Sequence, residues 1–383
     1  MRIIYISISS RCDGSVLCLL NLLDVLVANH KVQPLVILSS KGYLSDELIK
    51  RKIPFHAIPM FFSIYPTTEN LSRVVFSPLR LLVYMFFNFI AMVKVIFIAK
   101  KFKPNLIHTN NGVVRCGFYA AKFLKIPHIW HLREYQDLGL GFKIFPCKIF
   151  FLKLLSTRGN YSVAITQGIA DHFRPAESRV VYDGVRKKSE IIKSFDIKKE
   201  DYILYVGNLN EQKGFTDLLH AWNSFCKENN HFILKVAGES IQKNYQNFYL
   251  NYIRQNNLTN RIEILGVRHD IDFLMQHARA LVVPSYFEGF GRITAEAMLN
   301  YCLVVGRDSA GTAEILKTQH LGELFSSQEQ LIEILHKICN ASNDEYQLMI
   351  QKAYETAVKL YLTEDNAENI YKFYLDVLEH CNS

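Results

Sequence analysis

Short apolar runs alternate with stretches of helical spacing along the chain, and polar residues gather where the apolar runs end. Ala280–Val283 is a typical case, because four apolar residues in a row predict a buried parallel strand. Pro284 ends that run, Gly289 and Gly291 predict a tight turn, and helical spacing begins at Ile293. A strand, a glycine turn and a helix in this order place a helix N-terminus where it favours a phosphate.

The same strand and helix units recur in both halves of the chain. Strands are predicted over residues 2–9, 32–38, 52–56, 105–109, 126–134, 202–207, 232–238 and 262–266, with helical spacing between most of them. This alternation predicts α/β domains with doubly wound sheets, in which ligands bind at the strand ends. Residues 366–380 form an amphipathic pattern and predict a final helix.

Residues 81–99 are the most apolar part of the chain, and their length approaches that of a membrane span. Asn88 and Lys94 interrupt the run, and a strand follows directly at residue 105. A core helix, a core helix with one face dipping into a membrane, and a true span are all compatible with this pattern. A second basic and apolar stretch at residues 142–155 strengthens the membrane-surface interpretation.

Length and charge narrow the function classes. A chain of 383 residues fits two domains better than one core. Residues 1–190 hold 26 Lys/Arg against 11 Asp/Glu, whereas the remainder holds 18 against 25, so the first half is expected to face an anionic surface. No nucleic-acid motif is present, and a membrane or a lipid pyrophosphate fits better. Eight scattered cysteines without a C-x-x-C pair predict buried thiols in a reducing cytosol.

Two acidic residues, Glu288 and Glu296, bracket the glycine turn. Carboxylates beside an anion site are unfavourable unless they bind something else, and sugar or ribose hydroxyls are the obvious candidates. We therefore predict a nucleotide-sugar site. The run Glu288-Gly-Phe-Gly-Arg-Ile-Thr-Ala-Glu296-Ala-Met resembles the E-x7-E signature of glycosyltransferase family 4, and the similarity continues through residues 304–315.

That family consists of retaining enzymes of the GT-B fold, some of which build bacterial cell-surface polysaccharide and lipopolysaccharide. The resemblance implies an α/β chain with two Rossmann-like doubly wound domains facing a cleft. We expect an acceptor-binding domain at residues 1–190 and a nucleotide-sugar-binding domain at residues 191–362. A C-terminal helix at residues 363–383 is expected to cross back onto the first domain.

The resemblance also implies roles for residues of the second half. Lys213 and Gly214 match the family's Gly-Arg-Leu-x(3)-Lys-Gly segment, whose cations grip the donor diphosphate. The arginine of that segment is Asn208 here, so Arg292 or Arg133 would have to supply the missing charge. Glu288 would bind the sugar and, with Lys213 and His131, act in catalysis, while Glu296 would bind ribose. The donor site would comprise Gly14, Asn208, Gly266, Val267, Arg268, Gly289, Phe290, Gly291, Arg292, Ile293, Thr294 and Glu296.

In the first half, Trp130-His131-Leu-Arg133-Glu134 resembles the family's Trp-His-x-Arg-Glu segment. By that resemblance His131 lies near the donor's sugar and phosphate, and Asn110, Arg133 and Glu134 line the acceptor side. A histidine at a strand end is also typical of a satisfied structural group, and that alternative is open. Asp183 stands where the family's Tyr-Asn-Gly-Val segment has asparagine.

The sequence thus predicts a metal-independent retaining glycosyltransferase of the hexosyltransferase type, with a UDP- or GDP-linked sugar as donor substrate and no cofactor. The acceptor is expected to be a glycan or a lipid-pyrophosphate-linked saccharide. The protein is expected to be cytoplasmic and to act at the inner face of the cytoplasmic membrane. The basic first domain is expected to make the peripheral contact with that membrane. Asp270-Ile-Asp272 fits a metal-binding Asp-x-Asp, but its position favours capping of a helix, so no metal site is predicted. A GT-B sugar-nucleotide epimerase and a non-catalytic binding module are the alternatives.

Overall fold

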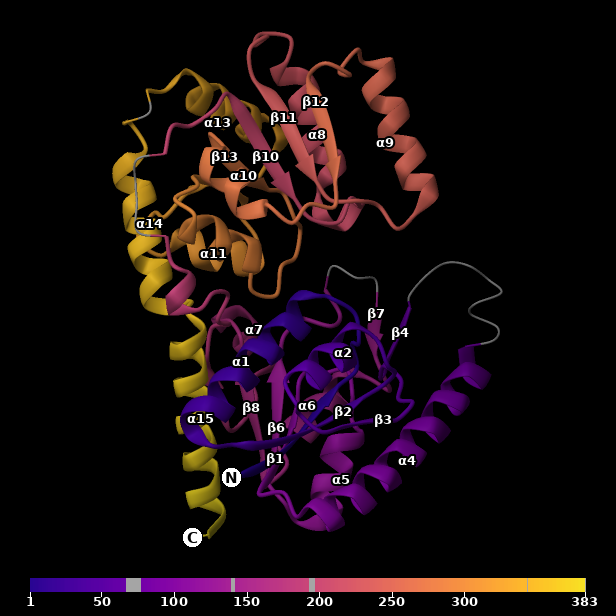
Figure 1. The fold of residues 1–383 in the computed structure, drawn as a ribbon. Coiled ribbons are helices and arrows are strands. Elements are labelled where there is room, and N and C mark those ends of the chain that lie inside the picture. The colour runs from indigo at the N-terminus through magenta and orange to yellow at the C-terminus, as the bar shows by residue number, and fades with distance from the viewer. Residues whose placement is uncertain (67–76, 139–141, 193–196, 343, 383) are drawn as a thin grey trace. The chain divides into compact units, whose positions relative to one another are not determined.

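The computed structural model of the protein describes residues 1–66, 77–138, 142–192, 197–342 and 344–382, and it divides into two units (Figure 1). Unit 1 consists of Met1–Gly184 together with Thr363–Ser383, and unit 2 consists of Val185–Leu362. Each unit is a parallel sheet with helices on both faces, as the alternating pattern predicts.

Within the described residues, the main sheet of unit 1 has the strand order β3-β2-β1-β5-β6-β8-β9. The strands are β1 (Arg2–Ser7), β2 (Gln33–Leu38), β3 (Phe55–Ala57), β5 (Leu106–Thr109), β6 (His128–Leu132), β8 (Asn160–Ala164) and β9 (Ser178–Val180). The helices are α1 (Gly14–His30), α2 (Tyr43–Lys50), α4 (Ser77–Phe102), α5 (Cys116–Leu124), α6 (Lys148–Leu155), α7 (Gln167–Phe173) and α15 (Thr363–Asn382). A small antiparallel pair joins β4 (Ile64–Pro66) to β7 (Phe142–Ile144).

Alternate side chains of β1 separate the core of unit 1 into two layers, since successive residues of a strand point to opposite faces. Ile3 and Tyr5 pack in a buried cluster with residues of α1 and α15. Ile4 and Ile6 pack in another cluster with residues of α4 and α5. The C-terminal helix α15 therefore completes one face of unit 1, which confirms that the chain returns to its first domain.

Unit 2 has a parallel sheet of order β12-β11-β10-β13-β14-β15 within the described residues. Its strands are β10 (Tyr202–Val206), β11 (Ile233–Ala237), β12 (Ile262–Gly266), β13 (Ala280–Val283), β14 (Val304–Arg307) and β15 (Glu323–Phe325). Its α-helices are α8 (Phe215–Phe225), α9 (Lys243–Gln255), α10 (Ile271–His277), α11 (Arg292–Leu299), α12 (Ala310–Lys317), α13 (Gln328–Asn340) and α14 (Gln347–Leu360), and η1 (Lys188–Glu190) and η2 (Glu211–Lys213) are 3-10 helices.

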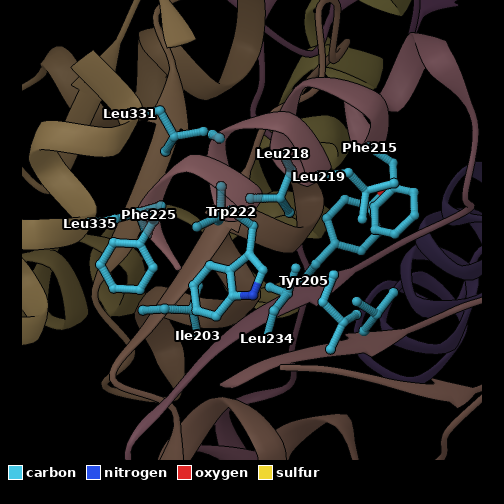
Figure 2. Packing of buried hydrophobic residues seen from close by; sticks show 14 of the residues in the cluster. Ile203, Tyr205, Phe215, Leu218, Leu219, Trp222, Phe225, Leu234, Leu331 and Leu335 are labelled. Carbon is cyan, nitrogen blue, oxygen red and sulfur yellow. The ribbon is translucent and has the colours of Figure 1, made fainter. Parts of the chain in front are cut away.

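Trp222 of α8 lies at the centre of the unit 2 core, between Ile203 and Leu234 of the sheet and neighbouring side chains of α8 (Figure 2). Its indole N–H donates to the Arg261 carbonyl oxygen at 3.1 Å, so the large ring is buried with its one polar atom satisfied. The cysteines depart from expectation, because Cys12, Cys147 and Cys381 are exposed free thiols.

Candidate functional site

The carboxyl ends of β10 and β13 lie next to each other, because these strands are neighbours in the unit 2 sheet. From β10 the chain runs outward through β11 and β12 and then returns to β13 on the opposite side of β10. Ligands of open α/β sheets bind at such a reversal, outside the carboxyl ends of the strands. The segments that leave β10 and β13 at this point carry Lys213 and Glu288.

Lys213 and Glu288 form an ion pair at this edge of the sheet, with Lys213 Nζ 2.6 Å from Glu288 Oε1. Asn210 caps η2 by accepting a hydrogen bond from the Lys213 amide at 2.9 Å, which fixes the turn that carries the lysine. The side chains are 35% and 16% exposed, so solvent still reaches both. Two motifs that are distant in sequence thus meet in one contact.

Gly214 brings this turn against the end of β13. Its φ is +67°, and a Cβ there would lie 2.0 Å from the Pro284 carbonyl oxygen, so only glycine fits. Arg307 donates from Nε to the same oxygen at 2.8 Å, lies 4.2 Å from the Tyr286 ring centre and pairs with Asp217. Arg307, Tyr286 and Asp217 were not predicted as site residues from the sequence; the one available signal was the position of Arg307 at the end of a strand.

The turn from Gly289 to Gly291 lies against the start of α12. The Gly311 amide donates to the Glu288 carbonyl oxygen at 3.0 Å, and a Cβ on Gly311 would lie 2.4 Å from the Phe290 oxygen. Gly291, with φ +88°, leads directly into α11. The N-termini of α11 and α12 therefore both lie at this turn, and their dipoles make it favourable for negative charge.

Two threonine hydroxyls lie beneath the turn. A Cβ on Gly291 would meet Thr312 Oγ1 at 3.2 Å and Thr294 Oγ1 at 3.4 Å. Both hydroxyls are buried and have no hydrogen-bond partner in the part of the chain that the structure describes. Unpaired buried hydroxyls are rare in folded proteins, so they mark this turn as unusual. Ile293, which precedes Thr294 in the first turn of α11, is half-buried.

Glu296 pairs with Arg292 one helical turn away, with Oε1 2.7 Å from Nε. Burial raises the pKa of Glu296, while Arg292 and Arg186 act to lower it. Arg292 also donates to the Val185 carbonyl oxygen at 3.0 Å. The guanidinium that the sequence offered as a second diphosphate cation is therefore already bound to a carboxylate.

The remaining predicted donor residues of unit 2 lie along the same carboxyl edge. Asn208 follows β10 and is exposed, Gly266 ends β12 with φ +67°, and Val267 is exposed. Arg268 binds Asp270 through two hydrogen bonds of 2.8 and 2.6 Å. The predicted capping is wrong in one respect: Asp270 occupies the N-cap position of α10, but its carboxylate bonds to Arg268 and not to the helix amides.

In unit 1, Arg133 joins the predicted acceptor residue Asn110 to Asp183. Arg133 Nε donates to Asn110 Oδ1 at 3.0 Å, and Nη1 lies 2.7 and 2.6 Å from the two carboxylate oxygens of Asp183. The arginine and aspartate side chains are 6% and 8% exposed, so this is a buried ion pair. The aspartate at position 183 is thus explained, because it neutralises a buried guanidinium.

His131, on β6, is fully buried and lies in a chain of polar groups. Its Nδ1 is 3.1 Å from His108 Nε2 and 3.4 Å from Arg133 Nη2, and a guanidinium can only donate. We therefore assign the His131 proton to Nε2, and His108 then accepts at Nδ1 from the Tyr374 hydroxyl at 2.6 Å. Burial lowers the pKa of both histidines well below the usual value, and Arg133 lowers it further, so the rings are neutral.

His131 Nε2 has no hydrogen-bond partner in the described part of the chain. A fully satisfied structural histidine would not leave a buried N–H unpaired. His131 is therefore better described as a neutral donor that is held by His108 and directed by Tyr374 of α15.

Glu134 follows β6, and it lies close enough to Asp13, the residue before Gly14, for the two carboxylates to interact. Burial and, to a smaller extent, Asp13 raise the pKa of Glu134 while Arg133 lowers it, and the net pKa is about 7. Asp13 caps α1 by accepting from the Val16 amide at 3.0 Å, and Gly14 is the first residue of that helix. Among the residues described, no cluster of three or more His, Cys, Asp or Glu is placed to hold a metal ion.

Comparisons with known proteins agree with this architecture. Residues 187–356 match the family described as glycosyl transferases group 1. An uncharacterised glycosyltransferase of Methanocaldococcus jannaschii is 28% identical over 249 residues, which cover 63% of this chain and 66% of the relative. The N,N'-diacetylbacillosaminyl-diphospho-undecaprenol alpha-1,3-N-acetylgalactosaminyltransferase of Campylobacter jejuni is 23% identical over 321 residues, 74% of this chain and 82% of the relative.

In three of the curated relatives the match covers 66%, 60% and 64% of the relative, so the chain spans less than two thirds of each. Among solved structures, Anabaena HepE in complex with UDP has a TM-score of 0.78 at 19% identity, over 98% of this chain and 100% of that chain. This likeness confirms the predicted GT-B fold. The family match and the curated relatives make this chain similar to the group 1 glycosyltransferases.

Proposed function

We propose that this protein is a group 1 glycosyltransferase, and more closely a metal-independent retaining enzyme of family 4. It would move a sugar from a nucleoside-diphosphate sugar to a glycan or lipid-linked saccharide in surface polysaccharide synthesis. The observation that carries the proposal is the Lys213–Glu288 contact at the strand reversal of unit 2, beside the N-terminus of α11.

The donor is proposed to bind with its diphosphate at the Gly289–Gly291 turn. Two helix N-termini and Lys213 supply positive potential there, which stabilises the negative charge that builds as the nucleoside diphosphate leaves. Glu288 would accept hydrogen bonds from sugar hydroxyls and Glu296 from ribose. A UDP-linked donor is the first choice, since HepE, of the same fold, was solved with UDP and with UDP-glucose.

Retention is proposed to follow from a donor phosphate oxygen that takes the acceptor's proton as the sugar–phosphate bond loosens. His131 would donate from Nε2 to the sugar or phosphate, because its neutral ring has a proton on that atom. Asn110, Arg133 and Glu134 would lie on the acceptor side, where the buried Arg133–Asp183 pair holds the Asn110 amide in place.

The acceptor is proposed to be a saccharide on a lipid pyrophosphate. The basic first half of the chain favours an anionic membrane-bound substrate, and the Campylobacter relative is named for a diphospho-undecaprenol acceptor. The enzyme would then work at the inner face of the cytoplasmic membrane as a peripheral protein.

The test measures release of nucleoside diphosphate from UDP-glucose and other nucleotide sugars, with and without a polyprenyl-diphosphate-linked saccharide. Lys213→Ala and Glu288→Ala are each expected to slow acceptor-dependent release by roughly 10²–10³-fold without unfolding the protein. Lys337→Ala and Glu323→Ala are the matched controls, because that ion pair of 3.0 Å lies in the same unit on β15 and α13. Near-normal rates in either site variant would contradict the proposal.

Two other outcomes would replace it. Conversion of the nucleotide sugar without an acceptor would indicate an epimerase or a hydrolase. Binding without any release would indicate a non-catalytic module. Retention itself is tested by the anomeric proton coupling of the product, which must match that of the donor.

A further inference from the structure

Helix α4 of unit 1 exposes an apolar surface that a soluble protein rarely leaves uncovered. Leu81–Phe102 is long and apolar enough to cross a membrane, yet only 17% of its most apolar window is buried. The exposed large side chains, here called the α4 face, are Leu82, Val83, Met85, Phe86, Phe87, Phe89 and Phe97.

The opposite side of α4 is fixed to the rest of unit 1. Ala91, Val95 and Ala99 are buried at four-residue spacing and pack with Ile4 and Ile6 of the sheet. At about 100° per residue, Phe86 and Phe97 lie on the side of the helix opposite to this stripe. Figure 1 shows α4 running along α5 over the same layer. One side of α4 is therefore packed on the sheet of unit 1. A helix that crosses a membrane by itself would be surrounded by lipid on all sides, so this packing does not fit a single membrane span.

Asn88 adds a second attachment. Its amide accepts from the Phe61 N–H at 2.9 Å and donates to the Phe61 carbonyl at 3.1 Å. The Phe61 ring also stacks on Tyr84, with centres 4.6 Å apart. The polar residue that interrupts the apolar run is thus satisfied inside the protein, and the α4 face keeps its outward direction.

Lysines border the C-terminal part of the α4 face, and no carboxylate lies near this face in the sequence. The segment Leu81–Arg133 contains eight Lys/Arg and no Asp or Glu. Lys94, Lys100 and Lys101 are exposed on α4 itself. An apolar helix face bordered by lysines is typical of a helix that lies in the interface of an anionic membrane.

The neighbouring helices α5 and α6 also expose large apolar side chains. Phe123 of α5 and Ile149 of α6 are 66% and 67% exposed. The Arg115 guanidinium lies 5.7 Å from the Phe150 ring centre, which links the start of α5 to α6. A second copy of the chain is a poorer occupant, because a symmetric contact through α4 would bring its lysines towards like charges.

We propose that the α4 face inserts into the headgroup–acyl boundary of an anionic lipid bilayer, with the α4 lysines at the lipid phosphates. The purpose, access to a lipid-linked acceptor, rests on the proposed function; the binding itself does not. Insertion is peripheral, so salt and loss of the exposed phenylalanines both weaken it.

The test is flotation of the full chain with vesicles of phosphatidylglycerol and phosphatidylethanolamine, and with vesicles of phosphatidylcholine alone. The wild type is expected to float with the anionic vesicles at low salt and to float less at high salt. Phe86→Asp/Phe97→Asp is expected to weaken binding about a hundredfold, at about tenfold for each phenylalanine removed from the interface. Lys100→Glu/Lys101→Glu is expected to remove the preference for anionic lipid.

The matched control is Phe248→Asp on α9, since Phe248 is an exposed phenylalanine of unit 2 at 42%. This control should float like the wild type, and all variants should keep the wild-type circular dichroism and thermal midpoint. No flotation of the wild type, or equal flotation of Phe86→Asp/Phe97→Asp, would overturn the proposal. Resistance of the wild type to alkaline carbonate extraction would also overturn it, because that result indicates a membrane span. So would a wild-type dimer in sedimentation that Phe86→Asp/Phe97→Asp converts to a monomer, if the wild type binds no vesicles.

The assay of nucleoside diphosphate release is run on the same variants with a water-soluble saccharide acceptor. Phe86→Asp/Phe97→Asp should turn over this acceptor at the wild-type rate. Flotation of the wild type without turnover would count against the proposed function alone, and turnover by the wild type without flotation would count against membrane insertion alone.

Discussion

Replacing Glu134 with glutamine should stabilise unit 1 in a pH-dependent way. Glu134 follows β6, where burial raises its pKa from 4.5 to about 7, with Asp13 raising it and Arg133 lowering it. Glutamine has the shape of the protonated carboxyl and never ionises. The difference between the two proteins therefore reports what the ionised carboxylate costs the folded state.

The sign follows from the protons bound in each state. Below pH 4.5 the carboxyl is protonated in the folded and the unfolded chain alike, so the substitution changes little. Between pH 4.5 and about 7 the folded chain keeps a proton that the unfolded chain has lost, and the free energy of unfolding falls as pH rises. Above that range the loss is complete and amounts to about 3 kcal/mol, at roughly 1.4 kcal/mol for each pKa unit.

The assay is urea unfolding followed by tryptophan fluorescence in a Trp222→Phe background. The chain has two tryptophans, and Trp130 on β6 then reports unit 1 alone. Glu134→Gln is expected to exceed its parent by about 3 kcal/mol at pH 8 and by less than about 1 kcal/mol at pH 5. Glu177→Gln, at an exposed position of unit 1, is the control and should show no such trend. A difference that is the same at both pH values would refute the reasoning.

Three further substitutions test other contacts of the candidate site. Asp183→Ala leaves the buried Arg133 charge unpaired and should lower the free energy of unfolding by about 3–5 kcal/mol in urea titrations, most of which Asp183→Ala/Arg133→Met should restore. Gly214→Ala places a Cβ 2.0 Å from the Pro284 carbonyl oxygen and so displaces the turn that carries Lys213. The variant should stay folded at room temperature but should no longer show a rise in thermal midpoint when UDP is added. Tyr374→Phe removes the donor to His108 and should cost about 1–3 kcal/mol and reduce turnover, whereas Tyr5→Phe, whose hydroxyl contact with Tyr374 is 3.3 Å, should change both less.

The parts of the fold that the sequence predicts well are those with strong local signals. Ala280–Val283 is a strand as predicted, because a buried parallel strand needs an apolar run and Pro284 cannot continue it. The final helix was also predicted, because its apolar residues follow helical spacing. Ion pairs do not have such signals. Arg133 and Asp183 are close only because β6 and the segment after β9 both end at the same edge of unit 1.

Helix α4 shows why the sequence left three alternatives open. Its residues are apolar on every side, so spacing does not reveal which face packs. The small residues Ala91 and Ala99 turn out to face the sheet, and the phenylalanines face outward. Likewise, Tyr374 on α15, the partner of His108, lies 266 residues away in the sequence. The motifs that resemble the family lie at strand ends and do not include Tyr374, so the contact was not predicted.

The two units place polar residues at equivalent positions, and a difference in burial separates their roles. In unit 1 the chain reverses between β1 and β5, and Asn110, just after β5, donates to the Ser15 carbonyl oxygen of the segment after β1 at 3.3 Å. The cation there, Arg133, is paired at less than 10% exposure, and breaking a buried pair is unfavourable by several kcal/mol. Lys213 is paired at 35% exposure, where an ion pair contributes about 1 kcal/mol or less and its carboxylate can be exchanged for a ligand's phosphate. An anionic ligand is therefore expected to gain more at the strand reversal of unit 2, which supports our proposal that the diphosphate binds there.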